Sequence, residues 1–131
     1  MFDKLLGKKN ELLWILEHNT VYTGGTSSNK KDLINKDLKI IKTNRGGKYT
    51  YHGPGQRIIY VMIDLRKKGY DIRGFVTLLE NWIISSLKTI GISATNDKDH
   101  VGIWVKEKNK LNKISSIGLR VRKGITFHGV S

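Results

Sequence analysis

The sequence predicts an α/β (α+β) fold, in which a mixed and largely antiparallel sheet with packed helices forms a single domain over residues 1–131. Short apolar runs rich in β-branched residues recur along the chain, as is typical of strands. One longer segment near the middle has apolar residues at helical spacing. The length of 131 residues and the 38% of hydrophobic residues suit one domain with a buried core.

The first half of the chain predicts strands separated by turns. Leu12–Leu16 is a short apolar run, which we interpret as a buried strand. The segment Thr23–Asn29 consists of turn residues and predicts a loop. Lys39–Thr43 predicts a second strand, and the β-branched and aromatic run Arg57–Asp64 predicts a third.

A helix is predicted from Ile72 to about Ile90. Asp71 precedes it as the N-cap, and Gly91 lies where a glycine commonly ends a helix. Apolar residues within it recur at spacings of three and four, which places them on one helix face. They are Phe75, Leu79, Trp82, Ile83, Leu87 and Ile90.

The last third of the chain returns to strand patterns. Val101–Val105 predicts a strand, and Lys106–Asn112 is interpreted as a polar turn. Ile117–Arg122 alternates apolar residues with polar or small ones, as a half-buried strand does. After Gly124, the segment Ile125–His128 continues the sheet.

The chain is strongly basic, with 24 Lys and Arg residues against 11 Asp and Glu and a formal net charge of +13. Such a charge favours acidic proteins or nucleic acids as partners. The lysines are scattered, and Ile and Asn are also abundant, which favours a compositional bias over a nucleic-acid-binding stripe. The acid-free segment from residue 112 to 131 carries basic residues that could receive an acidic partner, namely Lys113, Arg120, Arg122 and Lys123.

Composition also argues against several function classes. No apolar run is long enough to span a bilayer and the start is too short and polar for a signal peptide, so we expect a cytoplasmic protein with no membrane partner. The absence of cysteine removes disulfides, cysteine-ligated zinc and thiol catalysis from these residues. The four histidines form no helical pair and lie near no carboxylate cluster, so we expect neither a metal nor a cofactor.

Three segments could carry chemistry. Arg45–Gln56 holds four glycines and the only proline, which would let its backbone approach a ligand closely, although an ordinary glycine-rich turn is an equal alternative. The ammonium of Lys113 could lower the pKa of a nucleophile or act as an acid, the alternative being a solvated charge at a strand edge. His128 and Gly129 could close a pocket.

The string RGGKYTYHGPGQ at Arg45–Gln56 closely resembles the signature of lipoyl(octanoyl) transferases, which move an octanoyl group from acyl carrier protein to a lysine of a lipoyl domain. Further segments are similar to that family in the same order: LLWILEHNTVYTGGT from Leu12, VGIWV from Val101, KISSIGLRVRKG from Lys113 and TFHG from Thr126. The resemblance covers most of the chain and implies the fold shared with biotin and lipoate ligases.

The resemblance also implies roles for individual residues. Lys113 would lower the pKa of a nucleophilic cysteine. The partners would be octanoyl-acyl carrier protein and the lipoyl domains of 2-oxoacid dehydrogenases and the glycine cleavage H protein. The substrate pocket would be lined by Arg45, Gly46, Gly47, Lys48, Tyr49, Thr50, Tyr51, His52, Ser116, Ile117, Gly118, Gly129, Val130 and Ser131.

The sequence departs from the family at its ends. Family members continue past TFHG into a segment ending in Pro-Cys-Gly, whose cysteine carries the acyl group, whereas this sequence stops at Ser131. The family's first strand and helix are also lacking. We therefore expect an incomplete catalytic domain and no transferase activity from these residues alone. Two rival interpretations are a lipoate or biotin ligase-like acyl-binding protein, which would need ATP, and a basic nucleic-acid-binding module.

Overall fold

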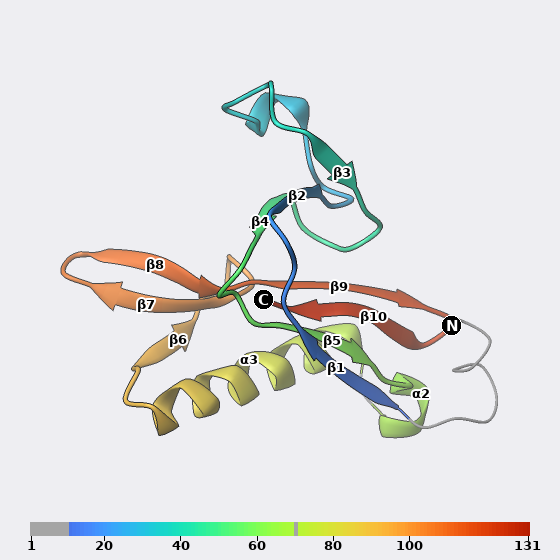
Figure 1. Cartoon of the computed structure of the whole chain (residues 1–131). Coiled ribbons are helices and arrows are strands. Elements are labelled where there is room, and N and C mark those ends of the chain that lie inside the picture. Colours follow the sequence, from blue (N-terminus) through green and yellow to red (C-terminus); the bar gives the residue numbers. More distant parts are fainter. Residues whose placement is uncertain (1–10, 70) are drawn as a thin grey trace. The chain divides into compact units, whose positions relative to one another are not determined.

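The computed structural model describes residues 11–69 and 71–131 (Figure 1). The chain forms two compact units. The first unit holds the described residues up to Asp64 together with Gly118–Ser131, and the second holds Leu65–Ile117 except residue 70. Each unit contains some of the predicted site residues and is built on strands that pair into sheets.

A four-stranded sheet with the strand order β1-β5-β10-β9 dominates the first unit. Its strands are β1 (Leu12–Leu16), β5 (Ile58–Met62), β10 (Ile125–Val130) and β9 (Ile117–Arg122). Both neighbours of β5 run antiparallel to it. The described core of this unit is aliphatic and consists of Ile58, Val61, Met62, Ile125 and Val130.

Thr126 is a polar residue inside this core. Its side chain is fully buried, and its hydroxyl donates to the Val61 carbonyl at 2.7 Å and accepts from the Ile63 N–H at 2.9 Å. Its own N–H donates to the Ile63 carbonyl at 2.9 Å. The hydroxyl therefore bridges β5 and β10, and its burial leaves no unmet hydrogen bond.

The strand prediction for Leu12–Leu16 is confirmed, but its predicted burial is wrong. β1 lies at the edge of the described sheet and pairs with β5 alone. Leu12, Leu13, Trp14 and Ile15 are each between 42% and 56% exposed. An apolar run identifies a strand but does not tell whether both of its faces are covered.

A three-stranded sheet with the order β3-β2-β4 completes the first unit. Strand β2 (Val21–Gly24) runs parallel to β3 (Ile40–Lys42) and antiparallel to β4 (Tyr49–His52). The loop predicted from Thr23 therefore begins only after Gly24. The glycine-rich segment Arg45–Gln56 is not only a turn, since it contains β4, which pairs with β2 along its whole length.

The second unit contains α2 (Leu65–Lys68), α3 (Ile72–Thr89) and the antiparallel sheet β6-β7-β8. Both predicted ends of α3 are confirmed. The Asp71 side chain accepts a hydrogen bond from the Gly74 N–H at 2.6 Å, and Gly91 follows the helix with φ +80°. Of the predicted apolar face, Phe75 and Leu79 are buried, whereas Trp82 and Ile90 are 39% and 69% exposed.

Strands β6 (Ala94–Asn96), β7 (Ile103–Glu107) and β8 (Lys110–Ser115) form this sheet. β7 and β8 make a hairpin (Figure 1). The prediction of a polar turn over Lys106–Asn112 is wrong except at its centre, because both strands extend into it. Strands that are exposed on both faces do not need to alternate apolar with polar residues. Their sequence can therefore resemble that of a loop. No helix among the described residues has the length and apolar composition that crossing a bilayer requires.

Candidate functional site

Arg45 is buried in the first unit, and all three nitrogen atoms of its guanidinium donate hydrogen bonds. Its Nε and Nη2 donate to the Thr23 hydroxyl at 3.2 and 2.7 Å, and Nη2 also donates to the Thr23 carbonyl at 2.9 Å. Its Nη1 donates to the Gly46 carbonyl at 2.9 Å. Burial lowers the pKa of the guanidinium below its usual value. The side chain therefore ties the glycine-rich segment to β2.

The backbone around Arg45 is held from two sides. On one side, the Gly25 N–H donates to the Lys48 carbonyl at 3.0 Å and the Thr26 N–H to the Arg45 carbonyl at 2.9 Å. On the other, the Gly46 N–H donates to the Leu119 carbonyl of β9 at 2.9 Å. The glycine-rich segment is thus a fixed element between β2 and β9.

Gly118 lies where β9 meets this segment. A Cβ atom at Gly118 would lie 3.2 Å from the Arg45 Cδ and 3.2 Å from the Gly46 carbonyl oxygen. A larger side chain would push the two segments apart. The structure therefore brings together three residues of the predicted pocket, Arg45, Gly46 and Gly118, from two segments far apart in the sequence.

Strand β4 divides the rest of the predicted set between its two faces. Thr50 and His52 lie on one face, and Tyr49 and Tyr51 on the other, because side chains alternate along a strand. Tyr51 is 47% exposed and its ring lies 5.2 Å from that of Tyr22. A ligand on one face of β4 can contact only half of these residues.

Gly47 and Lys48 lie at the exposed edge of the segment. The Lys48 ammonium pairs with the Asp32 carboxylate at 3.2 Å, and 68% of the Lys48 side chain is exposed. An exposed ion pair contributes little to stability, about 0–1 kcal/mol. Of the two, Gly47 has a clear backbone role, since it adopts φ +86°, a conformation that glycine reaches without strain.

Three histidines and a tyrosine gather in the first unit. The His18 Nε2 lies 2.7 Å from the Tyr60 hydroxyl, and the His18 and His52 rings lie 6.0 Å apart. Tyr60 makes an edge contact with His128 at 6.3 Å. Sequence reasoning missed His18 and Tyr60 as members of a site. Their only signal was that His18 falls in the LLWILEHNTVYTGGT segment and Tyr60 in the strand that follows RGGKYTYHGPGQ.

The imidazoles of His52 and His128 favour the neutral form. Burial lowers the pKa of His52, and His18 and Arg45 lower it further, although the hydrogen bond to Gln56 at 2.7 Å acts in the opposite direction. Burial also lowers the pKa of His128, aided by the charges of Arg45 and Arg120. Burial raises the pKa of Tyr60. The side chains of His52, His128 and Tyr60 therefore favour their neutral forms near neutral pH.

The predicted segment His128–Ser131 forms the end of β10 and the residue after it. His128 adopts φ +61°, an uncommon conformation for a residue with a side chain. Gly129 faces Tyr60 across the strand pair, and a Cβ there would collide with the Ile59 carbonyl. Val130 is buried and Ser131 is half-buried. Backbone strain of this kind is often found at functional sites.

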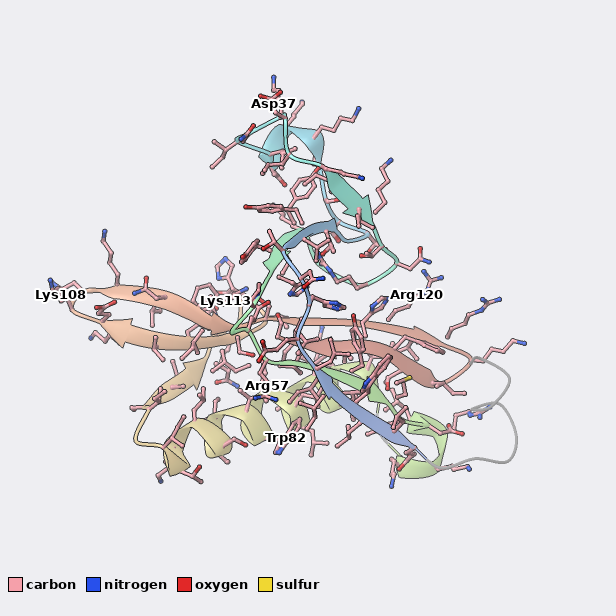
Figure 2. All side chains as sticks on the ribbon, viewed as in Figure 1. Asp37, Arg57, Trp82, Lys108, Lys113 and Arg120 are labelled. Carbon is pink, nitrogen blue, oxygen red and sulfur yellow. The ribbon has the colours of Figure 1, made fainter. Side chains whose placement is uncertain are left out.

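The second unit carries Lys113, in the middle of β8 and opposite Trp104 of β7. Its Nζ donates to the Val101 carbonyl at 2.9 Å and lies 4.6 Å from the centre of the Trp104 ring. Figure 2 shows Lys113 away from the hairpin tip, where Lys108 lies. Ser116 separates β8 from β9, and Ile117 is the first residue of β9. Among the described residues, no group of three or more His, Cys, Asp or Glu could hold a metal ion.

The family model of the lipoyl protein ligase A/B catalytic domain matches residues 1–131. The chain belongs to this family. The octanoyltransferase of Bartonella tribocorum is 49% identical to this chain. The alignment covers 98% of this chain and 57% of the length of that relative. That of Parvibaculum lavamentivorans is 47% identical over 95% of this chain and 58% of its own length. The chain thus spans a little over half the length of these curated relatives.

Solved structures of this family share the fold. Lipoate-protein ligase A bound with ATP has a TM-score of 0.69 at 19% identity, over 93% of this chain and 53% of its own. A bi-partite lipoate protein ligase from Thermoplasma acidophilum has a TM-score of 0.68 at 15% identity, over 93% of this chain and 48% of its own. At such identities the likeness concerns the fold alone, and it confirms the predicted ligase-like α+β class.

Proposed function

We propose that the complete protein transfers an octanoyl group from acyl carrier protein to a lysine of lipoyl domains in lipoate biosynthesis. The observation that carries this proposal is the 47–49% identity to octanoyltransferases over almost the whole chain. The ligases of known structure reach only 15–19%. The rival interpretations, a ligase-like protein and a nucleic-acid-binding module, are not favoured by these relatives.

The reaction would proceed by two acyl transfers. A cysteine thiolate supplied from outside these residues, which contain no cysteine, attacks the carbonyl carbon of the octanoyl thioester, and the carrier thiol leaves. The Lys113 ammonium lowers the pKa of the cysteine and can protonate the leaving thiol. The amine of the acceptor lysine then attacks the new thioester, an amide forms, and the cysteine leaves as a thiolate. The attacking amine gives its proton to the neutral Lys113 amine, which restores the ammonium.

The acyl pocket in this proposal is lined by the residues given above, in three short segments: Arg45–His52, Ser116–Gly118 and Gly129–Ser131. Within the first unit, the contact of Gly118 with Arg45 and Gly46 supports the proposal, because it fixes the glycine-rich backbone in place. Backbone N–H groups near Ser116–Gly118 could stabilise the oxyanion of each step. An octanoyl tail gains roughly 0.8 kcal/mol for each methylene that it buries, which would select for chain length.

The proposed partners are octanoyl-acyl carrier protein, the lipoyl domains of 2-oxoacid dehydrogenases and the glycine cleavage H protein. These are acidic proteins as a class, and the net charge of +13 suits them. The β9–β10 hairpin carries Arg120, Arg122 and Lys123 and is the proposed docking surface. We place the reaction in the cytoplasm and propose that residues 1–131 belong to a single catalytic domain.

An assay of the chain joined to the remaining segments of the Bartonella relative tests the function. With octanoyl-carrier protein and a lipoyl domain, we expect octanoylation of the domain without ATP. The 131-residue chain alone is expected to give none, because it has no cysteine. A requirement for ATP and free octanoate would transfer the assignment to the ligases. Activity of the chain alone would refute the proposed cysteine mechanism.

A further inference from the structure

The Lys113 side chain of the second unit contacts a backbone carbonyl, an aromatic ring and a glycine. Its Nζ donates to the Val101 carbonyl and lies over the Trp104 ring. Its side chain also runs across Gly102, since a Cβ at Gly102 would lie 3.0 Å from the Lys113 Cε and 3.2 Å from its Nζ. An exposed lysine rarely meets a carbonyl, an aromatic face and a bare backbone together, because its long side chain has many rotamers.

Gly102 makes this path possible. It adopts φ +133°, which residues with side chains rarely reach. A Cβ there would also lie 2.9 Å from the Ser115 carbonyl oxygen. Any larger residue would therefore displace the Lys113 side chain, the neighbouring strand or both.

Glu80 of α3 holds Gly102 in place. The Glu80 side chain is buried, with 6% exposed, and its Oε1 accepts from the Gly102 N–H at 3.2 Å. Its Oε2 accepts from the Asn96 Nδ2 at 3.4 Å. A buried carboxylate is costly unless it is hydrogen-bonded. Glu80 was not among the apolar positions predicted for the helix, and its position is explained by its bond to the loop.

Trp104 is fixed from the same loop. Its indole Nε1 donates to the His100 carbonyl at 3.1 Å, and the His100 ring meets its edge at 6.2 Å. The Asp97 carboxylate accepts from the N–H groups of Asp99 and His100 at 2.8 and 3.0 Å. The loop from Asp97 to Gly102 is thereby ordered at both ends, and it supplies the carbonyl that Lys113 binds.

We propose that Glu80, Gly102 and Trp104 are positioning residues that hold the Lys113 ammonium at the Val101 carbonyl for acyl transfer. The inference rests on the proposed function, in which Lys113 acts on the nucleophile. Trp104 attracts the ammonium to its ring face, Gly102 leaves room for the side chain, and Glu80 fixes the loop. None of the three contacts the reacting atoms in this scheme.

The first test needs no enzymatic activity. In the 131-residue chain with isotope-labelled lysine, the Hε signals of Lys113 should be shifted upfield by the Trp104 ring, relative to those of Lys106 on the same hairpin. Trp104→Leu should remove the shift, Trp104→Phe should retain part of it, and Gly102→Ala should reduce it. Amide spectra establish that each variant is folded. Lys113 signals that match those of Lys106 in the unmodified chain would overturn the proposal.

The second test uses the completed transferase described above. Trp104→Leu should lower kcat about two- to fivefold, the range expected for loss of an exposed cation–π contact, with KM unchanged and with recovery in Trp104→Phe. Trp82→Leu, which alters a 39% exposed tryptophan on α3, is the matched control and should leave kcat unchanged. An unchanged kcat in Trp104→Leu would refute the positioning role. An inactive unmodified enzyme with a shifted Lys113 signal would instead refute the proposed function.

Discussion

At the scale of single residues, the site depends on polar groups that are buried together with their partners. Arg45 is the clearest case, because Thr23 accepts three of its four hydrogen bonds. A buried guanidinium that loses its acceptor retains the cost of having left water. The Arg-Gly-Gly motif therefore has a structural meaning that its sequence alone did not reveal.

Thr23→Val tests this interpretation. The substitution keeps the shape of the side chain but removes the hydroxyl that accepts from Nε and Nη2. We expect the free energy of unfolding, measured by urea denaturation, to fall by about 2 kcal/mol, the cost of leaving buried donors unsatisfied. Thr20→Val, at an exposed position in the same region, is the control. Equal effects of the two substitutions would contradict the role of Thr23.

The histidine cluster predicts a pH dependence of stability. The pKa of His52 and that of His128 are lowered in the folded state, so the unfolded chain binds more protons just below pH 6.5. Stability is then fully present above about pH 6.5, the unfolded pKa, and is lost as the pH falls towards the folded values. Urea denaturation midpoints recorded between pH 7.5 and pH 5 measure this loss of stability.

Two substitutions, His128→Asn and Arg120→Gln, test whether His128 contributes to this pH dependence. Asn tolerates the positive φ of His128 and does not titrate, so this variant should show a shallower loss of stability on acidification. Removing the Arg120 charge should raise the pKa of His128 and act in the same direction. A slope that neither substitution changes would mean that His128 does not contribute.

At the scale of elements, the sequence predicts what local chemistry determines. The capped ends of α3 and the strands β5 and β10 were predicted within a few residues, because caps and β-branched runs are local signals. The β7–β8 hairpin was missed, since its exposed strands carry mostly polar residues. The burial of β1 was wrong because burial depends on distant neighbours, which no local pattern reports.

The start of α3 offers a prediction at this scale. Asp71→Ala removes the acceptor of the Gly74 N–H, and the loss of an N-cap typically costs about 1 kcal/mol. Thermal or urea unfolding followed by circular dichroism measures the change. Asp37→Ala removes an exposed carboxylate elsewhere in the chain (Figure 2) and should have no comparable effect. If the two variants unfold alike, the cap does not stabilise the helix.

At the scale of the whole molecule, the net charge of +13 gains a specific meaning in the proposed docking surface. Reversing Arg120, Arg122 and Lys123 to Glu in the completed enzyme should slow association with the acidic carrier protein and flatten its dependence on salt. Reversing Lys106, Lys108 and Lys110 changes the net charge equally. Stopped-flow association rates that fall by the same factor in both variants would refute a docking role specific to the β9–β10 hairpin.

Sequence motifs predicted the family and named candidate residues for a site, but they could not say which of these residues are neighbours. That Gly118 lies against Arg45, and that Tyr60 joins His18 to His128, follow from the pairing of strands far apart in the chain. Alternation in β4 likewise separates Thr50 and His52 from Tyr49 and Tyr51. A motif names candidate residues for a site, whereas strand register decides which of them can share a face.

The most direct measurement is a titration of the 131-residue chain with octanoyl-pantetheine, followed through its backbone amide signals. We expect saturable shifts at Gly46, His52 and Gly118, and much weaker binding of acetyl-pantetheine, because most of the binding energy comes from the buried methylenes. Shifts confined to other parts of the chain, or equal binding of the two thioesters, would contradict an acyl site built on the glycine-rich segment.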